Sequence, residues 1–111
     1  MNLKLSYVNI FIVLCKKMEN YNKKIDFVIE EKDNNVSFIL TNPYEWVEGE
    51  YFNKFMIDGK STKGKGRGFG LTNINRMVER YHGIMQVQLE YDQDVKVVRF
   101  EIVLPINREG H

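Results

Sequence analysis

The chain has 111 residues, enough for one domain with its own hydrophobic core and short for two. Apolar residues make up 43% and charged residues 28%, which is ordinary for a soluble globular protein, and the net charge of +1 excludes a general polyanion-binding surface. The single cysteine, Cys15, excludes an internal disulfide, and with only two histidines the chain lacks the ligands of a structural zinc site.

The first predicted element lies in residues 3–24, which begin apolar and end polar. Apolar residues at positions 3, 7, 10, 11 and 14 fit one stripe of a helix, although the valine, isoleucine and phenylalanine content also fits a strand. We interpret the segment as a helix. Its uninterrupted apolar run, residues 10–15, is too short for a membrane span, and no small-residue cleavage site follows it as in a signal peptide.

Two β-rich runs follow, at residues 25–31 and 36–41. The polar sequence KDNN between them is typical of a turn, so the pattern predicts an antiparallel hairpin. We expect Asn42 and Pro43 to end the second strand, because proline cannot continue a central strand.

Residues 43–70 have no clear periodicity, and a connection of this length in a small domain is usually a lid or a binding loop. Its scattered aromatic residues indicate that part of it packs down, with a short helix around residues 51–57. We interpret Tyr44 and Trp46 as packing residues rather than as aromatic rings that stack on a base.

The clearest helical pattern covers residues 71–81, where apolar side chains recur on one stripe and polar ones oppose them. Gly83 is predicted to be the left-handed residue that ends this helix. Residues 84–91 and 95–104 then form a second hairpin about residues 92–94, closed by Pro105. The order helix, two strands, long loop, helix, two strands predicts an α+β fold with helices on one face of a mostly antiparallel sheet.

Between the long loop and the second helix lies the sequence GKSTKGKGRGFGLTNINRMVERYHG, residues 59–83. Alternating glycines let backbone N–H groups approach a ligand, four cations lie among them, and a helix N-terminus follows. These features predict a site for a polyanion such as phosphate. The spacing excludes a P-loop, a dinucleotide-binding fingerprint and a protein-kinase glycine loop. A flexible linker and an RNA-binding element are the alternatives that composition leaves open.

The glycine box, the amphipathic helix and the hairpin, in this order, resemble the second glycine box of the GHKL ATPases. More narrowly, they resemble the ATP-binding domain of sensor histidine kinases of the peptide-quorum-sensing type, in which T-K-G precedes G-x-G-x-G-L. The helix supplies the matching Asn73, Tyr81 and Gly83. The resemblance covers residues 24–106, and its specific part is residues 60–83.

The resemblance implies the Bergerat two-layer α/β sandwich, without part of the N-terminal helix region, and ATP held by its phosphates under the glycine-rich loop. Asn42 stands where the family reads the adenine amino group, and Asn9 is the candidate ligand for Mg²⁺. The positions that the resemblance assigns to ATP are Asn42, Lys60, Thr62, Lys63, Gly64, Gly66, Arg67, Gly68, Gly70, Leu71 and Thr72.

The resemblance also implies a whole protein in which this domain supplies the γ-phosphoryl group to a histidine on another domain. That parent would be a homodimeric, membrane-anchored two-component kinase with this domain in the cytoplasm, and no nucleic acid is expected as a partner. We predict a single domain over residues 1–107, with residues 108–111 a tag remnant, and no phosphate transfer by this chain alone. A degenerate ATPase-like interaction module and an RNA-binding protein remain alternatives.

Overall fold

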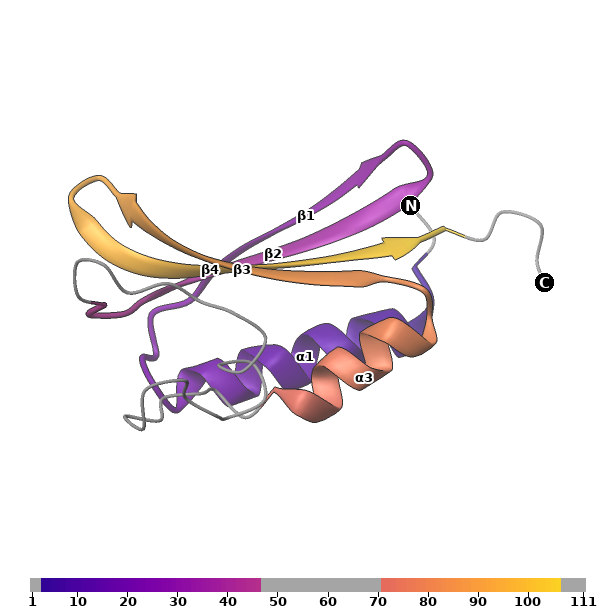
Figure 1. The fold of residues 1–111 in the computed structure, drawn as a ribbon, viewed down its shortest axis with the longest axis horizontal. Helices are drawn as coiled ribbons and strands as arrows, with labels where there is room; N and C mark the ends of the chain where they lie inside the picture. The colour runs from indigo at the N-terminus through magenta and orange to yellow at the C-terminus, as the bar shows by residue number, and fades with distance from the viewer. Residues whose placement is uncertain (1–2, 47–70, 107–111) are drawn as a thin grey trace.

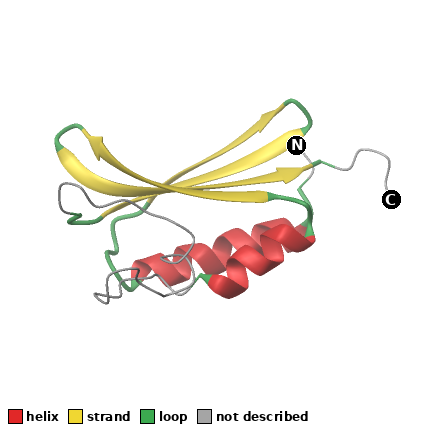
Figure 2. Ribbon diagram, viewed as in Figure 1, coloured by secondary structure: helices red, strands yellow, loops and turns green. Residues whose placement is uncertain are grey.

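The computed structural model describes residues 3–46 and 71–106. Two helices, α1 (Leu5–Glu19) and α3 (Thr72–Arg80), lie on one face of a sheet (Figures 1 and 2). The four strands are β1 (Asp26–Lys32), β2 (Asn35–Pro43), β3 (Ile84–Asp92) and β4 (Val95–Pro105). They form one antiparallel sheet in the order β1-β2-β4-β3. The predicted α+β fold and the predicted order of elements are confirmed.

The core lies between the helices and the facing side of the sheet. Helix α1 buries the stripe that its apolar spacing predicted, and β2 and β4 contribute alternate residues to the same layer. The fully buried large side chains include Leu14, Met18, Phe38, Leu40, Phe100, Ile102 and Leu104. The helical interpretation of residues 3–24 is therefore confirmed, because a strand could not present this stripe with a period of 3.6.

Both hairpins close with two-residue turns, which are shorter than the predicted ones. Asp33 and Asn34 have φ angles of 53° and 63°, and Gln93 and Asp94 have 50° and 72°. Two consecutive positive φ values are the requirement of a type I′ turn, whose twist matches that of the strands it joins. Asparagine and aspartate tolerate this left-handed region better than most residues, so the turn chemistry predicted here is correct.

Strand β2 ends at Pro43, as predicted, although Asn42 and Pro43 themselves still pair with β4. The next backbone N–H, that of Tyr44, donates to the Lys96 carbonyl oxygen of β4 at 3.0 Å. Because N–H groups alternate along a strand, the Pro43 nitrogen faces the opposite side. On that side β1 already ends at Asp26, which pairs with Thr41, so proline breaks no ladder hydrogen bond.

Helix α3 ends in a Schellman motif, but with a different left-handed residue from the predicted one. His82, with φ of 63°, occupies that position, and Gly83 does not have a positive φ. The N–H of His82 donates to the Glu79 carbonyl, and that of Gly83 donates to the Val78 carbonyl, each at 2.9 Å. Gly83 is instead required for space, because an added Cβ would lie 2.6 Å from the Val103 carbonyl oxygen.

Tyr7 ties the beginning of α1 to the end of β4, and this contact gives a first prediction. Its hydroxyl donates to the Pro105 carbonyl at 2.8 Å, and its ring meets Tyr81 edge-on at 5.3 Å. We expect Tyr7→Phe to lower the free energy of unfolding by about 1 kcal/mol, because one hydrogen bond is lost and the ring contact is kept. Urea unfolding at neutral pH measures this change.

The Tyr7 phenol also makes the stability of the folded domain depend on pH in the alkaline range. Burial raises the pKa of Tyr7 above its usual value of 10.0, and the neighbouring Tyr81 adds to the rise. The folded state therefore holds this proton more tightly, so the stabilisation is complete below the unfolded pKa and is lost as pH rises toward the folded pKa. The Tyr7→Phe protein should lose less stability above about pH 10 than the wild type. An equal loss of stability at alkaline pH in both proteins would contradict the assignment of this pH dependence to Tyr7.

Candidate functional site

The candidate site lies at the end of the molecule where α1 ends, α3 begins and β2 leaves the sheet (Figure 1). The two helices run antiparallel, so the C-terminus of α1 and the N-terminus of α3 lie at the same end. The edge-on contact of Tyr7 with Tyr81 marks the opposite end of the helical layer. The glycine-rich loop joins the described chain at Leu71, directly before α3.

Asn42 is the buried polar residue of this end, with 0% of its surface exposed. Its side-chain amide nitrogen donates to the carbonyl oxygens of Asn22, at 2.8 Å, and Lys24, at 3.2 Å, in the segment between α1 and β1. These two bonds fix the amide orientation. The other atom, Oδ1, is buried without a hydrogen-bond partner among the described residues. A buried acceptor of this kind is costly unless a ligand or water donates to it.

The first turn of α3 contributes a positive helix end. The N-cap residue is Leu71, whose apolar side chain makes no capping hydrogen bond, and the first turn of α3 holds no acidic residue. Leu71 is fully buried, so its side chain belongs to the core, and Thr72 is half-buried at the first helical position. The end is therefore chemically suited to an anion.

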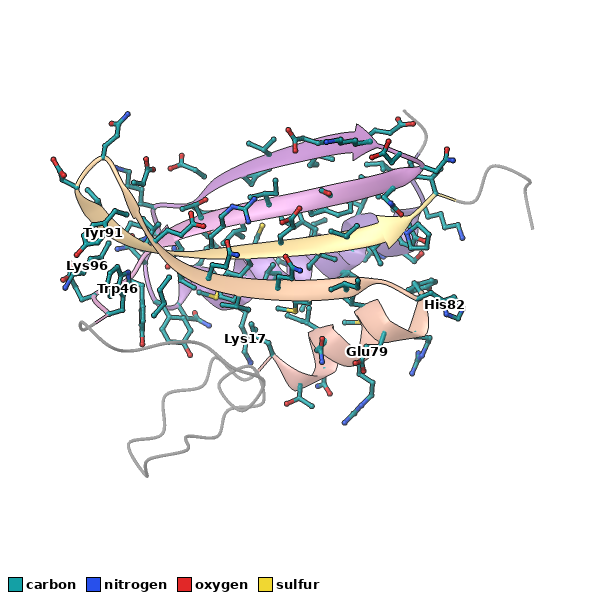
Figure 3. The ribbon with its side chains drawn as sticks, turned by 45° about the horizontal axis from the view of Figure 1, so that its top comes forward. Lys17, Trp46, Glu79, His82, Tyr91 and Lys96 are labelled. Carbon is teal, nitrogen blue, oxygen red and sulfur yellow. The ribbon has the colours of Figure 1, made fainter. Side chains whose placement is uncertain are left out.

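Lys17 lies on the side of α1 that faces α3. Residues 7, 10, 14 and 17 follow one stripe of α1, and Tyr7 at its beginning meets Tyr81 at the end of α3. Lys17 is ten residues after Tyr7 in α1, and Thr72 is nine residues before Tyr81 in α3, so both separations span about 14 Å. Lys17 therefore lies level with Thr72 in the antiparallel pair. Figure 3 shows the Lys17 side chain near the beginning of α3. An exposed cation thus lies beside the N-terminal end of α3.

A buried amide acceptor, a helix N-terminus and a neighbouring lysine lie at one end of a chain that also matches a family model. The model of the GHKL domain matches residues 10–105 of the chain. The chain belongs to the GHKL domain family. A curated relative, named as an NtrY-like sensor histidine kinase of Rickettsia prowazekii (strain Madrid E), is 29% identical over 91 residues. The match covers 78% of this chain and 15% of that protein, so the chain spans a small part of its relative's length.

The fold itself is that of a histidine kinase catalytic domain. The solved, nucleotide-free catalytic domain of the histidine kinase ThkA superposes with a TM-score of 0.59 at 21% sequence identity. The match covers 90% of this chain and 68% of that one. The resemblance to the GHKL ATPases and the two-layer sandwich predicted from the sequence are both confirmed.

Asn9, the predicted Mg²⁺ ligand of this GHKL domain, does not lie at the candidate site. It is exposed, on the turn of α1 that follows Tyr7, and therefore near the C-terminal end of α3. Across residues 3–46 and 71–106, no group of three or more His, Cys, Asp or Glu side chains is placed to hold a metal ion. The side chains described at the α3 N-terminus include a lysine rather than an acid, and they do not fit Mg²⁺.

Most of the predicted phosphate contacts of the GHKL domain lie outside the described residues. This set comprises Lys60, Thr62, Lys63, Gly64, Gly66, Arg67, Gly68 and Gly70, and the predicted helix around residues 51–57 lies in the same range. The structure places Asn42 against the segment that follows α1, through its hydrogen bonds to the carbonyl oxygens of Asn22 and Lys24. Sequence analysis missed Lys17, although its spacing of ten from Tyr7 on one helical stripe was a usable signal.

Trp46 and its neighbours close the edge of the sheet at this end (Figure 3). The indole is 7% exposed, its N–H donates to the Glu90 carbonyl at 3.3 Å, and its ring meets Tyr91 edge-on at 5.0 Å. The Lys96 ammonium lies 5.0 Å from the indole centroid. Trp46 thus packs in the protein, as predicted, because its ring is almost fully buried and both the ring and its N–H have protein partners.

Proposed function

We propose that this GHKL domain binds ATP, with the adenine amino group donating to Asn42 Oδ1. The buried Oδ1, which has no hydrogen-bond partner in the part of the chain that the structure describes, is the observation that carries the proposal. The two bonds to Asn22 and Lys24 leave Oδ1 as the acceptor, so the side chain is selective for a donor. Adenine offers such a donor in its exocyclic amino group, whereas a 6-oxo purine offers an acceptor at the same position.

The phosphates of ATP would lie at the beginning of α3, below the glycine-rich loop. The N–H groups of the first turn, where Leu71 provides no capping hydrogen bond, and the Lys17 ammonium support this placement from the described residues. Lys63 and Arg67 would add charge from the loop, and Gly66, Gly68 and Gly70 would let its backbone approach the phosphates. ATP supplies a transferable γ-phosphoryl group, while the residues of this chain bind it, orient it and neutralise its charge.

For the whole protein, we propose a sensor histidine kinase in which this domain presents ATP to a histidine on another domain. The named relative supports this role for the longer protein. The partner would be the phosphoacceptor domain of the same homodimeric kinase in a two-component pathway, with the ATP-binding domain in the cytoplasm. Within the described parts of the chain, neither helix has the length and apolar character needed to cross a membrane.

The ATP proposal predicts discrimination between purines. Isothermal titration should give a dissociation constant for inosine triphosphate about 10- to 100-fold above that for ATP, since Asn42 Oδ1 would meet a carbonyl oxygen instead of an amino group. The two nucleotides carry the same triphosphate, so inosine triphosphate is the matched control for charge. Equal affinities would contradict adenine reading by Asn42, and no binding of either would contradict the function.

A further inference from the structure

Asn22, in the segment between α1 and β1, makes three hydrogen bonds that join the end of the helix to Asn42. Its backbone N–H donates to the Met18 carbonyl oxygen in the last turn of α1, at 3.2 Å. Its side-chain Oδ1 accepts from the Lys24 backbone N–H at 2.8 Å. Its own carbonyl oxygen accepts from Asn42 Nδ2, also at 2.8 Å. Asn22 therefore links the helix end to the buried amide of the candidate site.

The bond from the Lys24 N–H to Asn22 Oδ1 closes an Asx turn, in which a side chain bends its own backbone. The carbonyl oxygens of Asn22 and Lys24 then lie 2.8 and 3.2 Å from one nitrogen, Asn42 Nδ2. In an extended chain, carbonyl groups two residues apart are about 7 Å from each other. One NH₂ group reaches acceptors that are at most about 6 Å apart, so an extended segment would offer it only one carbonyl.

The two carbonyl groups decide which end of the Asn42 amide faces the candidate site. Rotating the amide by 180° would exchange its oxygen and nitrogen, and would set Oδ1 against two oxygens that cannot donate to it. With both carbonyl groups in place, Oδ1 is the buried acceptor and has no hydrogen-bond partner among residues 3–46 and 71–106. With only one within reach the preference is weaker, and the rotated amide can offer an N–H to a ligand instead.

We propose that Asn22 is a positioning residue that sets the purine specificity of this domain through Asn42. This role rests on the proposed binding of ATP, and Asn22 acts on the nucleotide only by orienting the Asn42 amide. An acceptor at Oδ1 selects the 6-amino group of adenine, whereas a rotated amide would donate to the 6-oxo group of inosine triphosphate. The side chain of Asn22 therefore determines how strongly the site prefers ATP.

Isothermal titration of the whole chain with ATP and with inosine triphosphate tests this role. In Asn22→Ala, the ratio of the two dissociation constants should fall about 5- to 10-fold, because ATP binds more weakly and inosine triphosphate more tightly. A general loss of folded protein would weaken both nucleotides alike and leave the ratio unchanged. In Asn22→Asp the ratio should stay near its wild-type value, because a carboxylate oxygen accepts the same N–H and its charge acts equally on both triphosphates.

Asn20→Ala is the matched control, since it makes the same change at an exposed asparagine directly after α1. Its nucleotide ratio should equal that of the wild type. Circular dichroism establishes that each variant is folded. If Asn22→Ala does not fold, Asn22→Ser carries the test and should give an intermediate ratio, because a serine hydroxyl makes the same kind of turn more weakly.

Hydrogen exchange of the Asn42 side-chain amide, followed by NMR without nucleotide, measures the positioning directly. Exchange should be slow in the wild type and in Asn22→Asp, and about tenfold faster in Asn22→Ala, because one of the two carbonyl acceptors moves away. Equal exchange in the wild type and Asn22→Ala would overturn the role of the Asx turn.

The nucleotide ratios separate this role from the proposed function. If the wild type prefers ATP and Asn22→Ala keeps the same ratio, Asn22 is not a positioning residue and the ATP proposal stands. An equal fall in the ratio for Asn20→Ala would also overturn the role of Asn22. If the wild type binds the two nucleotides equally or binds neither, the proposed function fails and the specificity role fails with it.

Discussion

Replacing Gly83 with alanine is expected to destabilise the domain by about 3 kcal/mol, a large share of the roughly 5–15 kcal/mol typical of a domain. The new Cβ would lie 2.6 Å from both the Val103 carbonyl oxygen and Leu104 Cδ2, and 3.0 Å from Val78 Cγ1. Leu104 could move, but the Val103 oxygen belongs to the β4 backbone. The end of α3 would therefore have to separate from the sheet. Thermal unfolding should show a Tm lowered by about 10 °C or more.

The adjacent His82→Gly substitution is the matched control for this prediction. His82 has φ of 63°, where a non-glycine residue costs about 1 kcal/mol, and its side chain is exposed. Glycine relieves that cost but adds freedom to the unfolded chain, so the net change should lie within about 1 kcal/mol. If the left-handed position were Gly83, the two variants would exchange their effects. A small destabilisation by Gly83→Ala would contradict the prediction, because it would show that the β4 backbone at Val103 can move to make room for the new Cβ.

The elements were predictable because local chemistry and long-range packing agree in this chain. The α1 stripe and the residues of both turns point to the structure that tertiary packing also favours. Two details that differ from the prediction, the pairing of Pro43 with β4 and the role of Gly83, have a common physical origin. Each residue was interpreted by its backbone preference, whereas its role depends on a distant partner, the end of β1 for Pro43 and the Val103 carbonyl for Gly83.

The candidate site was predictable only in part. Asn42 was assigned from a family resemblance, but its buried, unpartnered Oδ1 depends on the carbonyl groups of Asn22 and Lys24. Segments that are far apart in sequence create that geometry, so no local sequence pattern could predict it. For Asn9 and Lys17, only the antiparallel packing of α1 against α3 shows which end of α1 lies beside the beginning of α3.

This chain alone is expected to bind ATP with an affinity that changes less than about threefold when Mg²⁺ is removed by a chelator. Asn9 lies near the C-terminal end of α3, whereas Lys17 lies beside its N-terminus. A lysine there neutralises phosphate charge without a metal. Lys17→Glu should weaken ATP binding about tenfold, because it replaces attraction by repulsion. Asn9→Ala should leave the affinity unchanged.

Lys16→Glu is the matched control for Lys17→Glu, since it makes the same charge change on the same turn of α1. Lys16 is one residue earlier, about 100° around the helix and outside the stripe that faces α3, so its effect should be several-fold smaller. Equal effects of the two variants would show a general charge effect and would remove Lys17 from the site.

Phosphate transfer by residues 1–111 alone is expected to be absent, even where ATP binds. Phosphoryl transfer depends on charge neutralisation at the γ-phosphoryl group and on an acceptor held in line with it. The described residues do not form a Mg²⁺ site, and a phosphoacceptor-histidine motif is not found in the sequence. Incubation with γ-labelled ATP should leave the nucleotide intact with and without Mg²⁺. Mg²⁺-dependent turnover that is lost in Asn9→Ala would contradict this expectation, because it would place the metal at α1's exposed asparagine.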